Sequence, residues 1–202
     1  KLPDKSNDGA KRGSICHLVF ECLGNPRHKK HYSKILKNKD IFASKPVEKL
    51  VMKHAIKDQV DDEENIKLIK DMTLNGLQYD FFGKEGGRPT ESISEKEFNI
   101  NVDEGGKKYA IRGFIDKLFL YKKKRLAIIR DFKSSKQVFK GKEITNNLQD
   151  LMYCLAVKHL YPEYLKRRSE FVFLKFDLSK DMLGKTGKGL LEMSVIEDEE
   201  LE

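Results

Sequence analysis

Apolar residues recur at every third or fourth position in three segments of the first part of the chain, a spacing typical of helices with one buried face. The predicted helices cover about 14–23, 46–58 and 61–79. Ser14 is suited to cap the first helix, and Gly24-Asn25-Pro26 follows it as a stop signal. The region 14–82 is therefore predicted to be mainly helical, behind a polar and flexible N-terminus over 1–13.

After a glycine-rich loop over 83–89, the pattern changes to an alternation of apolar and polar residues. Strands are predicted over 96–102, 109–121 and 126–132. The turn signal Asp103-Glu104-Gly105-Gly106 joins the first two strands, and the basic run Lys122-Lys123-Lys124-Arg125 joins the second to the third. Because short connections join neighbouring antiparallel strands, the region 96–133 is predicted to be a β-meander.

One further helix, over 146–161, and one further strand, over 170–178, complete the pattern. The apolar stripe of this helix contains Leu148, Leu151, Leu155 and His159. An acidic tail follows over 193–202. The order of helices, three strands, helix and strand predicts an α/β (α+β) fold, with helices flanking one sheet, in a single domain over 14–192.

Length and charge set the class of protein. The 202 residues correspond to one domain of ordinary size, large enough to bury a core. Lys and Arg outnumber Asp and Glu by 40 to 32, and the net charge of +8 favours a polyanionic partner. A lysine-rich, solvated surface explains the same charge without a partner. No stretch reaches the about 18 apolar residues that a membrane span needs, so no membrane partner is expected.

The three cysteines, Cys16, Cys22 and Cys154, have neither the even number of a disulfide framework nor the C-x-x-C spacing of a zinc site. They also do not make up a complete ligand set for an iron–sulfur cluster, so no such cluster is expected. Unpaired cysteines are typical of a reducing compartment, and an intracellular protein is therefore expected.

The run Asp131-Phe132-Lys133 ends a predicted strand, and alternation makes Asp131 and Lys133 project from the same face. Asp116 lies on the preceding strand, inside an apolar stretch where a carboxylate has to be solvated, paired or bound to metal. A hairpin between the two strands brings Asp116 close to Asp131. Two carboxylates and an ammonium at one sheet edge can hold a divalent cation and orient a water beside it. A surface ion pair is the alternative that the triplet alone leaves open.

Further motifs extend this constellation along the chain. Gly113-x-x-Asp116 precedes Asp131-x-Lys133 by fourteen intervening residues, and Gln149-x-x-x-Tyr153 follows on the predicted helix. His17 lies within Arg-Gly-Ser-Ile-Cys-His-Leu-Val-Phe-Glu, over 12–21, on the first predicted helix. This order resembles the RecB-like nucleases of the PD-(D/E)XK superfamily, which include CRISPR-associated RecB-like nucleases and phage exonucleases. The resemblance covers about 12–160, with long unmatched insertions.

The resemblance implies a restriction-endonuclease-like core with a mixed central β-sheet. It further implies that Mg²⁺ or Mn²⁺ is bound by His17, Asp116, Asp131 and the backbone carbonyl of Phe132. In this scheme Lys133 positions the attacking water, while Gln149 and Tyr153 contact the substrate strand or the active-site loop.

Two more sets of residues are candidates for binding the metal or the DNA. Glu97, on the strand before Asp116, is a weaker candidate for a carboxylate linked to the metal, and Glu95 on the same face competes with it. Basic residues in the loop after Lys133 are candidates for contacts with DNA phosphates, namely Lys136, Lys140 and Lys142. The basic run 122–125 lies at the opposite end of the strands, and we interpret it as a solvated turn.

The expected function is that of a Mg²⁺- or Mn²⁺-dependent deoxyribonuclease that hydrolyses DNA phosphodiester bonds and leaves a 5′-phosphate. An exonuclease in DNA recombination, repair or phage DNA processing fits this expectation. The chain has no G-x-x-x-x-G-K-[ST] motif, so a helicase or recombination protein that works with it would be a separate protein. Two alternatives stay open: a nucleic-acid-binding module without catalysis, and an RNA endonuclease on the same fold.

Overall fold

The computed structural model describes residues 8–84, 87–104, 106–177 and 189–201. They belong to two units, each built from several segments of the chain. The segments of the first, which we call the helical unit, are Lys1–Phe81, Phe132–Val138 and Val172–Leu190. Those of the second, the sheet unit, are Phe82–Asp131, Phe139–Phe171 and Leu191–Glu202.

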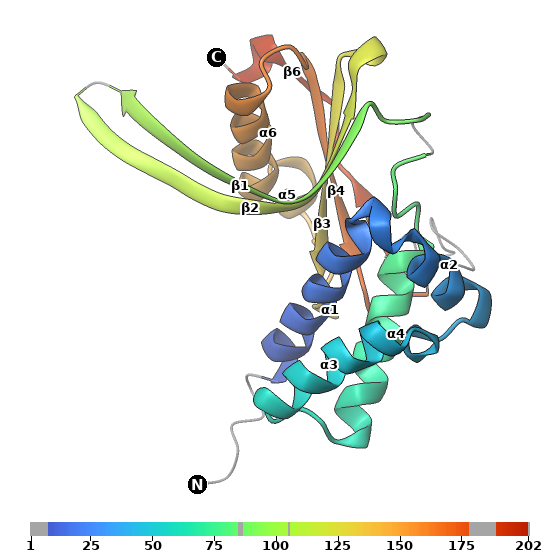
Figure 1. Cartoon of the computed structure of the whole chain (residues 1–202). Helices are drawn as coiled ribbons and strands as arrows, with labels where there is room; N and C mark the ends of the chain where they lie inside the picture. Colours follow the sequence, from blue (N-terminus) through green and yellow to red (C-terminus); the bar gives the residue numbers. More distant parts are fainter. Residues whose placement is uncertain (1–7, 85–86, 105, 178–188, 202) are drawn as a thin grey trace, which may run out of the picture. The chain divides into compact units, whose positions relative to one another are not determined.

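Four α-helices form the described N-terminal part of the helical unit (Figure 1). They are α1 (Asp8–Gly24), α2 (Lys29–Asn38), α3 (Lys45–Lys57) and α4 (Glu63–Gln78), with 3-10 turns at Pro26–His28 and Ile41–Ala43. Helices α1, α3 and α4 correspond to the three that apolar spacing predicts. Helix α2 is not among the predicted helices, and Ile35 is its one buried residue.

Helix α1 begins at Asp8, earlier than its predicted start at Ser14. Polar contacts extend it: the Arg12 guanidinium donates a hydrogen bond to the Asn65 side chain on α4. Gly13 lies so close to Ser134 that a Cβ at this glycine would be 2.8 Å from the Ser134 hydroxyl. An apolar pattern does not reveal such contacts. The rest of the predicted flexible N-terminus, residues 1–7, lies outside the described residues.

Close packing of small and aromatic residues organises the interior of the helical unit. The Thr73 hydroxyl of α4 donates to the Cys16 sulfur of α1 at 3.4 Å. A Cβ at Gly76 would collide with the ring of Phe20 and with Leu174. The Phe20 ring lies 4.3 Å from the ring of Phe132, centroid to centroid. Helix α1 is therefore packed both on α4 and on the segment that contains Phe132.

The described residues form one six-stranded sheet in the order β1-β2-β3-β4-β5, with β6 paired to β4. The strands are β1 (Glu91–Glu104), β2 (Lys107–Tyr121), β3 (Leu126–Lys133), β4 (Lys166–Phe173), β5 (Leu190–Glu192) and β6 (Ile196–Glu197). Strands β1 and β2 form a long curved hairpin (Figure 1), and β2 pairs antiparallel with β3. The predicted α/β fold is confirmed, with a mixed sheet flanked by helices and an N-terminal helical region.

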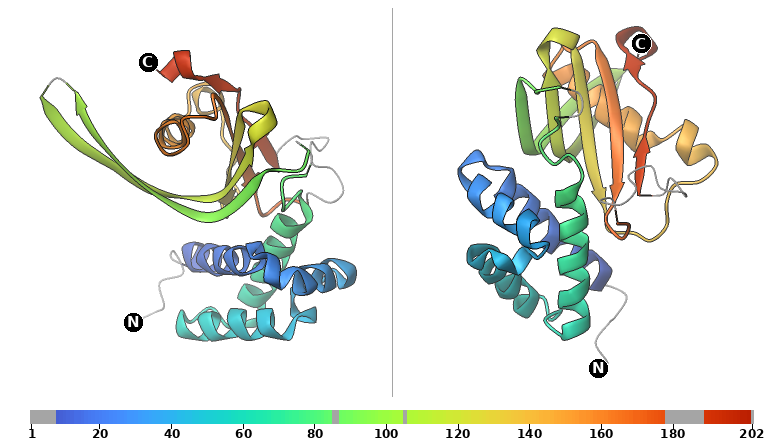
Figure 2. Two further views of the ribbon diagram at one scale, coloured as in Figure 1. Left: turned by 45° about the horizontal axis from the view of Figure 1, so that its top comes forward. Right: turned by 90° about the vertical axis from the view of Figure 1, so that its right-hand side faces the viewer.

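Within the sheet unit, helix α6 (Leu148–Leu160) lies along one face of the sheet (Figure 2). Its predicted apolar stripe is wrong as the buried face, because Leu148 is 71% exposed and Leu151 is 38% exposed. The buried positions are Asp150, Tyr153, Cys154, Ala156 and Val157. The apolar pattern misplaces this face because two of its buried residues, Asp150 and Tyr153, have polar side chains with hydrogen-bond partners in the unit.

Strand β4 begins at Lys166 and ends at Phe173, whereas the alternation predicts a strand over 170–178. The alternation begins at Glu170 and misses the polar first half of the strand, where Arg167 is buried and forms an ion pair. The Arg130 guanidinium lies 2.9 Å from Glu170, and Arg167 lies 2.5 Å from Asp198 in the short 3-10 helix Asp198–Leu201. Part of the predicted acidic tail thus packs on the sheet unit. Residues 178 and 202 of these predicted segments lie outside the described residues.

The cysteines and the helices bear on the class of protein. Cys16, Cys22 and Cys154 are free thiols, and Cys16 and Cys154 are buried. Within the described ranges, no helix combines the length and the apolar character needed to cross a bilayer.

Candidate metal centre

Asp116 on β2 and Asp131 on β3 are brought together by the pairing of these strands. The antiparallel register pairs Lys117 with Arg130 and Leu118 with Ile129. Continued by one residue, this register places Asp116 opposite Asp131. Asp131 is 5% exposed, and Asp116 is half-buried. The sheet thus brings together the two aspartates that the sequence singles out.

The Asp131 carboxylate is held by two side chains of α6. Tyr153 donates its hydroxyl hydrogen to Oδ1 of Asp131 at 2.7 Å, and the Gln149 amide donates to the same oxygen at 2.9 Å. The same amide also donates to the Tyr153 hydroxyl oxygen at 2.8 Å. Gln149 and Tyr153 are one helical turn apart, so they reach one oxygen from the same face of α6. The carboxylate is therefore fixed in one orientation.

The environment keeps Tyr153 protonated, so that it can donate this hydrogen bond. Burial raises the pKa of the Tyr153 phenol, and the negative charge of Asp131, its hydrogen bond and the charge of Asp116 raise this pKa further. Phe98 supports the ring of Tyr153 with an edge contact at 6.2 Å between centroids. Gly113 makes room for Phe98, because a Cβ at this position would lie 2.6 Å from its ring.

The alternation of buried side chains along β2 changes phase at Asp116. Ile115 and Leu118 pack in the same apolar core, although residues three apart point to opposite faces of a regular strand. Between them, the Lys117 ammonium lies over the rings of Phe82 and Phe119. The strand is therefore locally irregular at Asp116. Sequence reasoning missed this change of phase, because apolar residues occupy both faces of the strand around Asp116.

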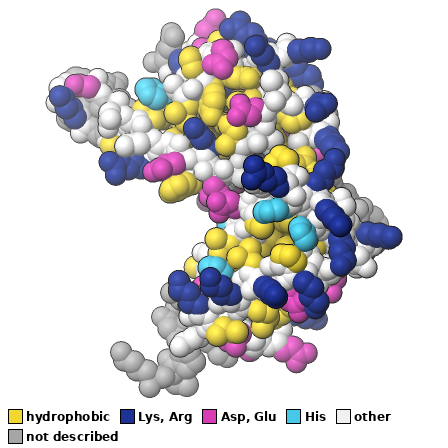
Figure 3. All heavy atoms as spheres, in the orientation of Figure 1, with side chains coloured by type: hydrophobic (Ala, Val, Ile, Leu, Met, Phe, Trp, Pro, Cys, Tyr) yellow, Lys and Arg dark blue, Asp and Glu magenta, His cyan; other side chains and the backbone are white. Residues whose placement is uncertain are grey.

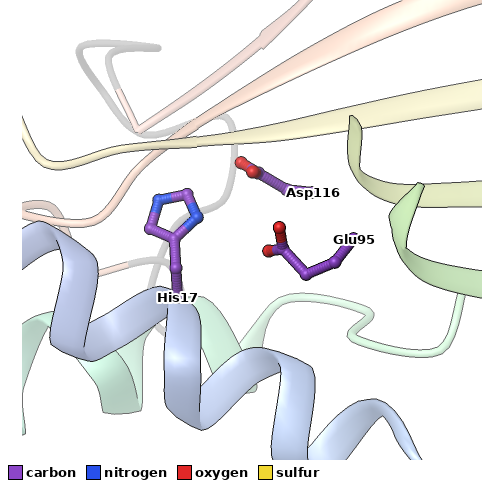
Figure 4. A group of neighbouring side chains, drawn as sticks. All are labelled: His17, Glu95 and Asp116. Carbon is purple, nitrogen blue, oxygen red and sulfur yellow. The ribbon is translucent and has the colours of Figure 1, made fainter. Parts of the chain in front are cut away.

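Strand β1 departs from regular geometry at Glu95, opposite the same point. Its register runs through Ser94↔Lys117 and Lys96↔Ile115, which puts Glu95 opposite Asp116. Glu95 has a φ of 51°, in the left-handed region that residues other than glycine adopt infrequently. Carboxylate oxygens of Glu95 and Asp116 lie within 4.8 Å of each other, and Figure 4 shows the two side chains together. Strain of this kind gathers at functional sites.

Glu97, the other candidate on β1, pairs with Phe114 and is exposed. The structure thus brings Glu95, and not Glu97, to the position opposite Asp116. The sequence pointed to Glu97 as the candidate carboxylate and to Glu95 as its competitor on the same face. The register of the hairpin decides the choice.

His17 projects from α1 in the helical unit (Figure 4). Its Nε2 lies 3.2 Å from the carbonyl oxygen of Phe132. Its ring meets the ring of Phe132 edge-on, with 6.3 Å between the centroids. The His17 imidazole and the Phe132 carbonyl, two of the metal ligands that the resemblance implies, are therefore neighbours within this unit. Phe132 is joined by a peptide bond to Asp131, the last sheet-unit residue of β3.

The lysines proposed from the sequence lie at and after the end of β3. Lys133 is half-buried, and its carbonyl accepts a hydrogen bond from the Leu174 amide at 2.9 Å. Lys136 and Lys140 are exposed in the following loop, and Lys142 begins the short helix α5 (Lys142–Thr145). Lys and Arg side chains are scattered over the visible face with acidic side chains between them (Figure 3). On this face, surface charge therefore does not by itself mark a nucleic-acid-binding site.

The carboxylates that the sheet unit brings together suit a hard divalent cation. Carboxylate and carbonyl oxygens are the ligands that Mg²⁺ and Mn²⁺ prefer, and an imidazole nitrogen is compatible with Mn²⁺. Glu95, Asp116 and Asp131 carry three negative charges at neighbouring positions of three adjacent strands. Carboxylates at neighbouring positions of a sheet can bind one divalent cation together.

Comparison with known proteins does not assign a family to the chain. No protein-family model matches, and no curated protein matches. Among solved structures, one titled "Crystal structure of SSO0001" matches over 72% of this chain with 16% sequence identity and a TM-score of 0.30. The chain spans 57% of the length of that structure.

Proposed function

We propose that this protein is a Mg²⁺- or Mn²⁺-dependent deoxyribonuclease that hydrolyses the phosphodiester bonds of DNA. The observation that carries the proposal is the facing pair Asp116 and Asp131, with one oxygen of Asp131 fixed by Gln149 and Tyr153. A carboxylate held by two donors in one orientation, next to a second carboxylate, suits a cation site better than a surface ion pair does.

The proposed ligands in the sheet unit are Asp116 and Asp131, with Glu95 as a further carboxylate for the same ion. Ligation by the His17 imidazole and the Phe132 carbonyl stays a prediction from the resemblance. The approach of His17 to the Phe132 oxygen, 3.2 Å, is comparable to the separation of about 3 Å between adjacent ligands of a six-coordinate ion of this size. A divalent cation bound there would lower the pKa of a bound water and polarise the scissile phosphate.

The residues of the chain have separate roles in this proposal. Lys133 follows Asp131 by two strand positions, and its ammonium orients the attacking water and stabilises the negative charge that develops on the phosphate. Gln149 and Tyr153 are positioning residues, because the hydrogen bonds that they make go to Asp131. Contact of these two residues with the substrate strand stays a prediction.

DNA is the proposed substrate, and the net charge of +8 favours such a polyanion. An exonuclease that acts in recombination, repair or phage DNA processing inside the cell, where the three free thiols stay reduced, agrees with the expectation from the sequence. A helicase or recombination protein would be a separate partner.

The direct test is to incubate the protein with labelled single-stranded DNA, duplex DNA and RNA in Mn²⁺ or in EDTA. We expect DNA to be cut only with the cation. Asp131→Ala and Lys133→Ala should abolish cleavage and keep the fold and most of the DNA affinity. Lys123→Ala, which removes an exposed charge from the turn Lys122–Lys124, is the matched control and should cut normally.

The same assay separates the alternatives. If DNA is bound but never cut, the protein is a nucleic-acid-binding module without catalysis. If RNA alone is cut, the protein is an RNA endonuclease. Full activity of Lys133→Ala would remove this lysine from the mechanism. A circular single strand separates the modes of attack, because an exonuclease leaves it intact while an endonuclease opens it.

A further inference from the structure

Three segments of the helical unit meet beside the end of β3. Ser134 packs on α1 at Gly13, where a Cβ would be 2.8 Å from the serine hydroxyl oxygen and 3.2 Å from its Cβ. The Leu174 amide donates to the carbonyl of Lys133 at 2.9 Å, which fixes the chain after β4 to the same place. α1, the loop after β3 and the segment after β4 are therefore held together by backbone and small-residue contacts.

Each of these segments carries a cation next to its contact point. Arg12 precedes Gly13, Lys136 follows Ser134 by two residues, and Lys175 follows Leu174. The pKa of Lys175 is lowered by partial burial and by the positive charges of Arg12 and Lys136. The three residues each lie within two residues of one of these contacts, and the effect of Arg12 and Lys136 on Lys175 agrees with this placement.

The described residues provide no acidic side chain that pairs with any of these three cations. Arg12 donates to the neutral amide of Asn65, and its Nε is buried without a hydrogen-bond partner among the described residues. Three gathered cations without such a counterion are unfavourable in isolation and attract an anion.

We propose that Arg12, Lys136 and Lys175 form a binding site for a phosphate group of a nucleic-acid strand, which we call the phosphate cluster. A phosphate offers oxygens to the planar guanidinium and accepts from the two ammonium groups and the Ser134 hydroxyl. The identification of its ligand as a DNA strand rests on the proposed nuclease function.

The position of the phosphate cluster explains what it would do. Gly13 and His17 are four residues apart and lie on one face of α1, and the contact of His17 with Phe132 is next to the contact of Gly13 with Ser134. Lys133 lies between these two contact points in the chain. A strand whose phosphate rests on the cluster is therefore held one helical turn from His17 and adjacent to Lys133.

The test measures binding of a fluorescein-labelled single-stranded DNA in EDTA, by anisotropy over a series of KCl concentrations. Lys136→Ala/Lys175→Ala should bind more weakly, and the slope of log K against log [KCl] should fall by about 1.4, because each neutralised phosphate of a single strand contributes about 0.7. The charge-matched control is Lys122→Ala/Lys123→Ala in the exposed turn, which should keep the wild-type slope. Circular dichroism checks that both variants are folded.

An unchanged slope in Lys136→Ala/Lys175→Ala, or an equal loss in both double variants, would overturn the proposal. If the first double variant unfolds, Lys136→Glu alone carries the test, because this side chain is exposed. Binding in EDTA needs neither metal nor cleavage, so the two proposals fail separately. A protein that binds DNA through the phosphate cluster but never cuts it would support the cluster and contradict the nuclease function. A protein that cuts DNA but binds it equally well without Lys136 and Lys175 would contradict only the proposal of the cluster.

Discussion

Glu95 on β1 and Asp116 on β2 hold facing positions at the point where both strands depart from regular geometry. Their carboxylate oxygens lie within 4.8 Å of each other, and Asp131 on β3 faces Asp116 from the other side by continuation of the register. Carboxylates that a locally irregular backbone brings together can share one divalent cation. This relationship gives the first prediction.

Glu95→Gln should weaken Mn²⁺ binding by about 10–100-fold, the range for residues that support a metal site, because it removes one negative charge beside Asp116. Isothermal titration with Mn²⁺ measures the change. Glu97→Gln is the matched control, since Glu97 is two residues away and opposite Phe114. In EDTA the Glu95 variant should be at least as stable as the wild type, because repulsion is relieved. Equal Mn²⁺ affinity in both variants would contradict the role of Glu95.

Tyr153→Phe should lower the free energy of unfolding by roughly 1–2 kcal/mol, because it deletes a buried hydrogen bond to Asp131 and keeps the ring. Cleavage should slow without a matching loss of DNA affinity, since the carboxylate loses one of two donors. Urea unfolding and DNA binding in EDTA measure the two effects. Leu148→Ala, on the exposed face of the same helix, is the control. A stable but fully active Tyr153→Phe variant would show that this hydrogen bond does not position Asp131 for cleavage.

Gly13→Ala should destabilise the protein by about 1–3 kcal/mol, because its Cβ would press on Ser134. Ser134→Gly should rescue most of this loss in the double variant, since both atoms that a Cβ at position 13 would meet belong to the Ser134 side chain. Thermal unfolding of the two single variants and the double variant measures the coupling. Strictly additive effects would mean that the two residues are not in contact.

Cys16 should resist thiol reagents in the folded protein at about pH 8, because burial raises the pKa of its thiol from 9.0 to about 12 and also excludes the reagent. Half-buried Cys22 should react first. The folded pKa of Cys16 is above the unfolded value, so its contribution to stability is complete below pH 9.0 and is lost as the pH rises toward about 12. Cys16→Ala should reduce this alkaline loss in thermal unfolding. Rapid labelling of Cys16 without unfolding would show that it is not buried.

Most of the helices and strands could be predicted from apolar periodicity, although helix α2 was missed. Helices α3 and α4 and the strands of the meander show period 3.6 or period 2 because one face of each is buried. The buried face of α6 was misplaced because Asp150 and Tyr153 are buried with hydrogen-bond partners, which no count of apolar residues can foresee.

The candidate site, too, could be predicted from the sequence only in part. Asp116, Asp131 and Lys133 could be named from the sequence, because alternation along one strand and a short hairpin between two strands are local properties of the chain. That Gln149 and Tyr153 hold the carboxylate of Asp131 depends on how α6 docks on the sheet.

The sequence by itself determined the helical and extended segments, the hairpin that pairs Asp116 with Asp131, and the chemical types of the candidate ligands. The tertiary structure alone decided that Glu95 faces Asp116, that Phe132 offers its carbonyl to His17, and that Arg12, Lys136 and Lys175 gather at one place. The physical reason is that periodicity records only whether a side chain faces the core. Which partner it meets depends on strand register and on contacts between residues far apart in the chain.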